Sequence, residues 1–312
     1  MTTRIICLGN TTLDKVWPVF DLPTGGGKVR ASDYFEVGGG MGANAAVAVA
    51  RLGGSVAYWG RAGDDAAGET MKNEMRSYGV DVNHFRLFPG ARSSTSAVLV
   101  ANDGERAIIN FRGAGIPDHP AWLPLEAVAG ADAALADIRW IEGACALFAK
   151  ARGCGVPTVL DAETAMPAAF AATLPLVDHA VFSEPGLRSF AGNRPLDNDE
   201  DRIAALARAR SLGCKVAALT RGGEGVIWVD DAGIHRQPAF VVDVVDTTGA
   251  GDVFHGAYTL TLGEGADVTD AMRFASAVAA LKCTRHGGRA GIPTRTAVTA
   301  FMADMQVRPA ST

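Results

Sequence analysis

The chain has 312 residues, of which 48% are hydrophobic and 20% charged, and its formal net charge is −5 at pH 7. Together with the 37 glycines, these values indicate a globular enzyme with many tight turns and exclude a disordered or fibrous chain. The acidic balance and the lack of a long basic run make nucleic acid and anionic membranes unsuitable partners.

Cysteine usage and the N-terminal segment indicate the compartment. The five cysteines are odd in number, far apart and without a C-x-x-C pair, which favours reduced thiols over disulfides or a zinc site. The chain starts with a strand pattern instead of a signal peptide, and it has no apolar run of about 18 residues. We therefore expect a cytoplasmic protein without membrane-spanning segments.

The first third of the chain combines a buried strand with segments typical of a small, separate sheet. Residues 4–9 form a short apolar run that ends in glycine, as in a strand buried on both faces. Residues 13–37 are broken by prolines and glycines, and an alanine-rich helix follows over 41–53. Residues 92–113 contain an Asn-Asp-Gly hairpin between alternating strands. Segments 13–37 and 92–113 are predicted to form a small β lid.

The rest of the chain alternates strand and helix patterns. Strands are expected at 133–138, 157–162, 179–183 and 215–220, helices at 142–155 and 198–213, then a hairpin over 225–240 and two C-terminal helices. Such alternation predicts a mostly parallel sheet with helices on both faces, in a single α/β domain over 1–312. Ligands should collect at the carboxyl ends of the strands.

The stretch "DTTGAGD", residues 246–252, runs from a strand pattern into a helix pattern. Gly249 and Gly251 permit close approach of the backbone, so the N–H groups from Ala250 to Asp252 are able to surround one anion. A carboxylate in a phosphate site suits a base that removes the proton of an acceptor hydroxyl. The alternative is an ordinary turn in which Asp252 caps the helix.

A second glycine loop, "GGGMGAN" at 38–44, also opens a helix, and "GNTTLD" and "LTRGGEGVIW" lie at 9–14 and 219–228. Each is weak evidence alone, because glycine turns in α/β proteins are usually only tight turns. In this order, the four segments resemble the ribokinase-like, or PfkB, family of sugar kinases over nearly the whole chain. The resemblance implies a ribokinase-like three-layer fold with a β lid, and a kinase that uses ATP with Mg²⁺. K⁺ is a further candidate cofactor.

The resemblance also implies roles for individual residues. Asp252 would be the catalytic base, and Gly249, Ala250 and Gly251 would form the anion hole. The sugar would contact Asp14, Gly39, Gly40, Asn44 and Asp252, and the nucleotide would contact Ser183, Thr220, Gly222, Gly225, Gly249 and Gly251. Asp246 and Thr248 resemble a monovalent-cation loop that backbone around 283–291 completes.

One motif departs from the family. The usual N-x-x-E segment, which organises magnesium, corresponds here to "SEPG", with Ser183 and Gly186 in place of Asn and Glu. Glu184 lies nearby and is the candidate for the magnesium shell.

Within the family, the chain most resembles the kinases that phosphorylate 6-deoxy-6-sulfofructose at its 1-hydroxyl in sulfoglycolysis. By that likeness, Lys28, Asn110 and Arg139 would hold the sulfonate. A sulfonate is a permanent anion, and arginine offers it paired donors. Other interpretations stay open: Lys28 in a solvated turn, Asn110 as a hairpin cap, and Arg139 in an ion pair with Asp137. Arg30, Arg112 and Arg285 are rival cations, and a sugar phosphate would suit the same donors.

Three further hypotheses compete with this function. The chain could phosphorylate another substrate, such as fructose, ribose, a sugar phosphate or a nucleoside. It could be a non-catalytic sugar or nucleotide sensor, since fold does not fix function. A dinucleotide-binding oxidoreductase is disfavoured, because no G-x-G-x-x-G follows the first strand. Exposed apolar positions on the lid predict a homodimer through the lids.

Overall fold

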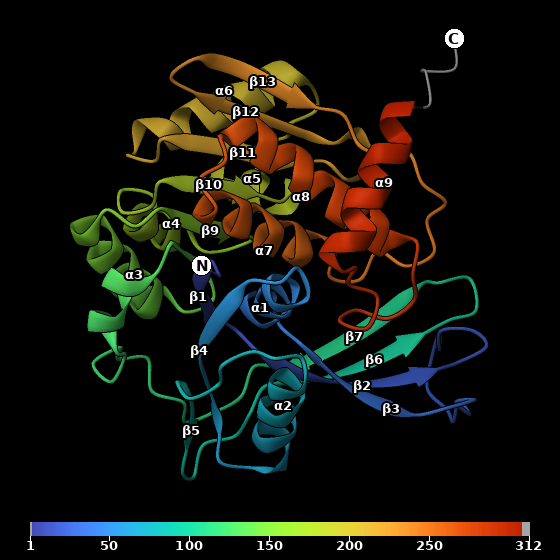
Figure 1. Cartoon of the computed structure of the whole chain (residues 1–312). Coiled ribbons are helices and arrows are strands. Elements are labelled where there is room, and N and C mark those ends of the chain that lie inside the picture. Colours follow the sequence, from blue (N-terminus) through green and yellow to red (C-terminus); the bar gives the residue numbers. More distant parts are fainter. Residues whose placement is uncertain (1, 308–312) are drawn as a thin grey trace.

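The computed structural model describes residues 2–307, so residue 1 and residues 308–312 of the predicted 1–312 domain lie outside it. A large sheet and a small sheet organise the chain (Figure 1). No helix in the described part of the chain has the length and hydrophobicity that a membrane span requires.

The large sheet has the order β13-β12-β11-β10-β9-β8-β1-β4-β5, and only β12 runs antiparallel to its neighbours. Its central strands are buried on both faces, which explains their apolar sequences. The strands are β1 (Arg4–Gly9), β4 (Ser55–Gly63), β5 (Phe85–Phe88), β8 (Ala133–Asp137), β9 (Thr158–Ala162), β10 (His179–Phe182), β11 (Val216–Thr220), β12 (Val226–Asp230) and β13 (Gly233–Gln237).

Helices cover both faces of this sheet and form one core on each. Alternate residues of β1 enter the two cores: Ile5 and Cys7 one, Ile6 and Leu8 the other. The first core includes α1 (Met41–Arg51), α2 (Ala66–Ser77), α7 (Ala250–Gly263), α8 (Val268–Cys283) and α9 (Arg295–Val307). The second includes η1 (Leu125–Gly130), α3 (Ile141–Cys154), α4 (Pro167–Thr173), α5 (Glu184–Phe190) and α6 (Asp199–Ser211). The predicted three-layer α/β class is confirmed.

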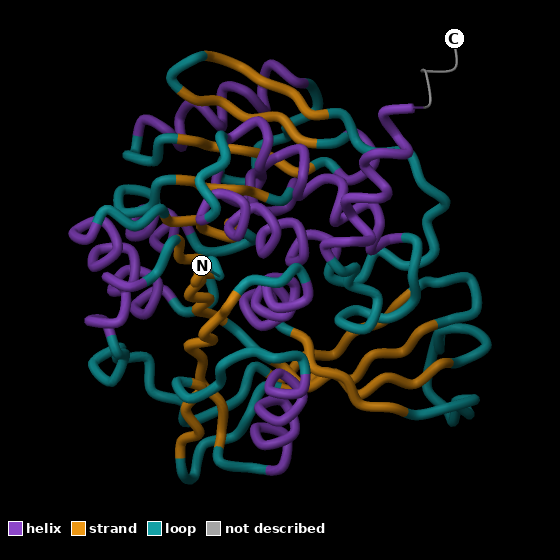
Figure 2. Tube along the Cα trace, viewed as in Figure 1, coloured by secondary structure: helices purple, strands orange, loops and turns teal. Residues whose placement is uncertain are grey.

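The small sheet stands to one side of the large one (Figures 1 and 2). Its order is β3-β2-β6-β7, where β2 (Thr12–Pro18) pairs with β3 (Phe35–Gly39), and β6 (Thr95–Val100) pairs with β7 (Arg106–Phe111). Both pairs are antiparallel, and β2 joins β6 in parallel. This sheet is the lid expected from segments 13–37 and 92–113, although residues 19–34 form a loop instead of strand.

Several short elements escaped the sequence prediction. Helices α4 and α5 have seven residues each and β5 has four, which is too short for a hydrophobic period to show. Three helices, α7, α8 and α9, occupy the C-terminal part of the described chain, where two were expected. The prediction of two C-terminal helices was therefore wrong.

Candidate active site

The predicted anion loop opens α7. Gly249 is the N-cap and adopts a left-handed backbone with φ 71°, which brings Ala250, Gly251 and Asp252 into the first helical turn. No acceptor within residues 2–307 takes the N–H of Gly251 or Asp252. These two donors, at the positive end of the helix dipole, are free to bind one anion.

A chain of hydrogen bonds fixes the Asp252 carboxylate. The Asn44 side-chain amide in α1 donates to Asp252 Oδ2 at 2.7 Å, and Arg289 Nε donates to Asn44 Oδ1 at 2.9 Å. Arg289 is 1% exposed, and its Nη1 lies 3.1 Å from Glu74 Oε2 of α2. Burial raises the pKa of Asp252, and the hydrogen bond from Asn44 opposes the rise. A raised pKa makes the carboxylate a stronger base.

This arrangement gives Asn44 two partners within the chain and adds Arg289 to the residues around Asp252. The Asn44 amide contacts Asp252 and Arg289, and its expected contact with the sugar stays a prediction. Arg289 was not recognised from the sequence, because an arginine in a glycine-rich stretch gives no sign of distant partners. Its position within "HGGRAG", among residues that permit close backbone approach, is the only local signal.

The turn before α1 needs its glycines. Gly40 has φ 97°, and a Cβ there would lie 2.4 Å from the carbonyl oxygen of Asn10. A Cβ on Gly39 would lie 2.5 Å from Asp14 Oδ2. The turn thus brings backbone against the first polar residues of the lid, where a sugar was expected.

Polar side chains form a row across the lid. Asp14 of β2 is in register with Ser96 of β6, which is in register with Asn110 of β7, so the three share one face. Asn110 Nδ2 donates to Ser96 Oγ at 3.1 Å. Burial raises the pKa of Asp14, and its hydrogen bond with Ser96 opposes the rise. The structure therefore brings the predicted sugar residues Asp14 and Asn110 onto one surface.

A cavity of about 630 Å³ lies between the lid, the Gly40 turn and the end of β8. Its lining includes Asn110 and Arg139, as expected, together with Arg61 and Arg112. Lys28 is exposed on the loop between β2 and β3 and is not among the lining residues. Two of the three residues proposed for the sulfonate thus share this cavity, and Arg112, named as a rival cation, joins them.

The arginines that line the cavity have different interaction partners. Arg61 Nη1 lies 2.8 Å from Asp118 Oδ1, and its guanidinium lies 4.1 Å from the ring centroid of Trp140. Arg139 Nη1 donates to the Thr164 carbonyl at 2.7 Å. Asp137 binds the backbone N–H of Arg139 at 2.9 Å and does not orient the guanidinium, so the suggested ion pair of these two residues is absent from the described contacts.

Asp137 instead joins three segments at the carboxyl edge of the sheet. Its fully buried carboxylate accepts hydrogen bonds from the N–H groups of Asn10 (2.6 Å), Gly42 (3.0 Å) and Arg139 (2.9 Å). Burial raises the pKa of Asp137, and these N–H groups oppose the rise. The residue holds the ends of β1 and β8 and the start of α1 around the cavity.

A second buried carboxylate lies beneath the anion loop. Asp161 is the penultimate residue of β9, and its Oδ2 lies 3.5 Å from His255 Nδ1 of α7. The same His255 nitrogen lies 2.7 Å from the carbonyl oxygen of Gly251. Burial raises the pKa of Asp161 to about 7; His255 opposes this shift and Asp252 adds to it. His255 was assigned no role from its sequence position, although it belongs to the first turns of the helix that carries the predicted base.

Four of the predicted nucleotide residues lie at or just after the ends of β10 and β11: Ser183, Thr220, Gly222 and Gly225. Thr220 Oγ1 donates to the Phe182 carbonyl at 3.3 Å, and Gly222 opens the short helix η2 (Gly222–Glu224). Gly225 has φ 91°, and a Cβ there would lie 2.1 Å from the carbonyl oxygen of Gln237. The structure brings Thr220, Gly222 and Gly225 into one tight turn beside β13.

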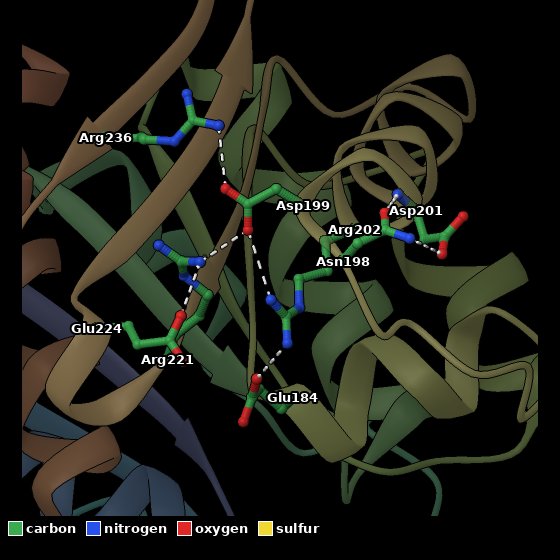
Figure 3. A network of polar contacts seen from close by, with 8 residues as sticks. All are labelled: Glu184, Asn198, Asp199, Asp201, Arg202, Arg221, Glu224 and Arg236. Carbon is green, nitrogen blue, oxygen red and sulfur yellow. Dashed lines mark hydrogen bonds and ion pairs between the residues drawn. The ribbon is translucent and has the colours of Figure 1, made fainter.

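An ion network holds this turn in place (Figure 3). Asp199, in the first turn of α6, accepts from Arg221 Nη1 at 2.9 Å and from Arg236 Nη2 at 3.0 Å. Arg202 lies 3.4 Å from Asp199 Oδ1 and 3.5 Å from Glu184 Oε1. Because Arg221 stands between Thr220 and Gly222, the network ties the nucleotide turn to α5, α6 and β13.

Ser183 and Glu184 of the "SEPG" segment both form contacts within the protein. Ser183 is the N-cap of α5, where its hydroxyl oxygen accepts the N–H of Gly186 at 3.0 Å. Glu184 pairs with Arg202. No group of three or more His, Cys, Asp or Glu residues in the described part of the chain is arranged to hold a metal ion. The roles of Ser183 and Glu184 stay predictions.

The predicted cation loop, which contains Asp246 and Thr248, contacts the segment 283–291 that was expected to complete it. Asp246 Oδ1 accepts the N–H of Thr248 and Oδ2 accepts the N–H of Gly287, each at 2.9 Å. Burial alone would raise the pKa of Asp246, but hydrogen bonds from Thr248 and Arg106 outweigh it and hold the pKa well below its usual range.

Known proteins share both the sequence and this fold. The pfkB family carbohydrate kinase model matches residues 2–295. Ribokinase of Bacillus subtilis is 30% identical over 299 residues, which cover 95% of this chain and 98% of that protein. A crystal structure of a candidate ribokinase from Agrobacterium tumefaciens superposes with a TM-score of 0.92 at 34% identity, covering 99% of this chain and 100% of that one.

A further structure has both ligands of such a reaction. Arabidopsis thaliana ribokinase complexed with ribose and ATP has a TM-score of 0.85 and 25% identity, covering 97% of this chain and 99% of that one. The family match and the full-length relatives agree with the free N–H groups and carboxylate at the start of α7. The chain belongs to the pfkB family of carbohydrate kinases and is an ATP-dependent sugar kinase.

Proposed function

We propose that this kinase phosphorylates the 1-hydroxyl of 6-deoxy-6-sulfofructose. The supporting observation is the cavity of about 630 Å³, in which Asn110, Arg112 and Arg139 line one space beside the Gly40 turn. A sulfonate keeps its charge at every physiological pH, and guanidinium groups offer it paired N–H donors. Asp14 and Asn110, in one row on the lid, supply groups for the sugar hydroxyls.

The proposed chemistry follows from the start of α7. Asp252 takes the proton of the 1-hydroxyl while that oxygen forms its bond to the γ-phosphorus of ATP. The bond between the γ-phosphorus and the bridging oxygen breaks, and ADP leaves. The N–H groups of Gly251 and Asp252 stabilise charge on the phosphoryl group in transit. Asn44 holds one carboxylate oxygen of Asp252, which leaves the other for the sugar.

We expect magnesium to arrive with ATP. Mg²⁺ usually binds through one or two carboxylates together with substrate phosphates, so a preformed cage of protein ligands is not required. Glu184 is the carboxylate that the sequence proposes, and it would have to release Arg202 to serve. When bound, the ion would neutralise charge on the phosphates.

The cations in the cavity provide a means of rejecting neutral sugars. Arg139 is exposed in this structure, and fructose bound over it in the same pose would cover its guanidinium without giving it an anionic partner. An unsatisfied buried polar group costs about 1–3 kcal/mol, which corresponds to roughly fivefold to 150-fold in kcat/KM. Selectivity would then come from an unpaired charge and not from shape alone.

Ribose is the second candidate, because the full-length relatives include ribokinases. The arginines beside the sugar favour an anionic substrate over ribose, and they would suit a sugar phosphate equally well. We also retain the proposals of a cytoplasmic location and of a homodimer through the lids. Ile109 and Phe111 of β7 are exposed by 75% and 37% on one lid face, which supports the dimer.

The test compares ADP release with sulfofructose, fructose, ribose and fructose 6-phosphate. Sulfofructose should give the highest kcat/KM, and Arg139→Met should raise its KM by about tenfold or more with little change for fructose. The variant Lys28→Met tests whether the exposed lysine contributes to the KM for sulfofructose. Arg152→Met, in the last turn of α3, is the control. Higher kcat/KM for ribose or fructose would overturn the substrate while leaving the kinase assignment intact.

A further inference from the structure

The loop expected to hold a monovalent cation is filled by hydrogen-bond donors of the chain itself. Lys282 Nζ donates to the main-chain carbonyl of Asp246 at 2.8 Å and lies 3.9 Å from its Oδ2. Arg106 Nη2 donates to Oδ1 of the same carboxylate at 2.8 Å. Thr248 and Gly287 supply the remaining N–H groups described at this carboxylate.

Lys282 is placed as an internal ion would be. It belongs to the last turn of α8, it is fully buried, and its charged end points at the turn that precedes the anion loop. Burial lowers the pKa of Lys282, and Asp246 opposes this shift. A buried ammonium is retained only with a charged or strongly polar partner, and Asp246 provides both a carbonyl and a carboxylate.

Arg106 approaches the same loop from the lid. Its guanidinium contacts the Thr248 hydroxyl as well as Asp246, across 142 and 140 residues of sequence. The Cys283 carbonyl, which belongs to the segment expected to complete a metal site, accepts the N–H groups of Val245 at 2.8 Å and Asp246 at 3.1 Å. The Asp246 carboxylate, the Asp246 carbonyl and the Cys283 carbonyl, which are three acceptors of the expected site, are thus already paired with donors. The charge of Lys282 would also repel a potassium ion at this carboxylate.

We propose that Lys282 is a built-in cation that replaces the monovalent metal ion at this loop, with Arg106 pairing the same carboxylate from the lid. The expected site for K⁺ and the residues present therefore disagree. The inference rests on the assignment to the kinase family but not on any particular sugar. Its consequence is that the turn from Asp246 to Thr248 is ordered, and the start of α7 positioned, without an added ion.

The first experiment uses the unmodified protein at constant ionic strength in choline, Li⁺, Na⁺, K⁺ or NH₄⁺ chloride. Both the melting temperature Tm and the rate of ADP release should be the same in K⁺ as in choline. A rise in Tm specific to K⁺ or NH₄⁺, or a severalfold activation by either, would overturn the proposal. The Tm measurement needs no sugar, so it stays decisive if the proposed substrate is wrong.

The second experiment removes the charge. Lys282→Ala should lower Tm in choline by roughly 6–12 °C, because a buried ion pair is broken. K⁺ or NH₄⁺ should now raise Tm and restore activity, since the vacated space exposes the Asp246 oxygens. Lys282→Met fills the space without a charge and should not respond to ions. Lys150→Ala, in an exposed pair with Glu126, is the control. A Lys282→Ala protein that folds with unchanged Tm and unchanged rate of ADP release would contradict the proposal. If this variant fails to fold, the ion series on the unmodified protein still tests the proposal.

Discussion

Asp252 receives its hydrogen bond from the neutral amide of Asn44 and not from a cation. The difference matters because a cation in contact would lower the pKa of a carboxylate, whereas burial here raises it. The charge of Arg289 is one residue further away, where it fixes the amide through Asn44 Oδ1. The carboxylate is therefore oriented without losing its basicity.

We predict that Asp252→Asn reduces kcat by about 10²–10⁴-fold with little change in KM, because it removes proton transfer and keeps the shape of the site. The rate of ADP release at saturating ATP and sugar measures this loss. Asp304→Asn, an exposed carboxylate of α9, should leave kcat unchanged. A change confined to KM would show that Asp252 binds substrate without acting as the base.

Asp161 should make the stability of the protein depend on pH. In the folded protein the carboxyl group of Asp161 keeps its proton up to about pH 7. In the unfolded protein an aspartate loses its proton near about pH 4. The unfolded state thus binds fewer protons between these values, so the free energy of unfolding falls as pH rises through this window and then levels off. Asp161→Asn should lack this slope in Tm measured from about pH 5 to pH 8. Parallel profiles for the two proteins would refute the assignment.

Among the elements, Arg106 joins the lid to the loop that precedes α7. This residue lies at the start of β7, on the same face as Asn110, and contacts both Asp246 and Thr248. We predict that Arg106→Gln speeds hydrogen exchange in β6 and β7 while lowering the free energy of unfolding by less than about 1 kcal/mol, since the pair is partly exposed. Lys15→Gln, in an exposed lid pair with Glu36, is the control. Unchanged exchange in β7 would show that Arg106 does not restrain the lid.

The elements also show where sequence reasoning succeeded. The strands of the large sheet were visible because burial on both faces requires continuous apolar runs, as in β8 and β9. The anion loop was visible because its glycines have a local backbone reason. Arg289 and Lys282 were missed as site residues, and Asp137 was considered only as a partner of Arg139. Their decisive partners lie far away in sequence: Asn44 is 245 residues from Arg289, and Asn10 is 127 residues from Asp137. No local pattern encodes such a contact.

At the scale of the whole molecule, the lid exposes apolar side chains on both faces. Ile108 shares a face with Asn110, and Ile109 points the other way; they are exposed by 60% and 75%. We predict a dimer in solution that Ile109→Asp converts to monomer, measured by light scattering over micromolar concentrations. Ile234→Asp, at a 50% exposed position on the edge strand β13, should leave the mass unchanged. A wild-type monomer throughout that range would refute the prediction.

The placement of Asn110 on β7 has an evolutionary consequence. This strand is an edge of the small sheet and pairs only with β6 among the described strands, while the proposed base and anion loop belong to a helix packed on the large sheet. Mutations at the end of β7 that is proposed to face the sugar disturb one ladder and leave the proposed phosphoryl-transfer groups of α7 unchanged. A kinase built this way can acquire a new nutrient by changing a few lid residues, with its chemistry inherited intact.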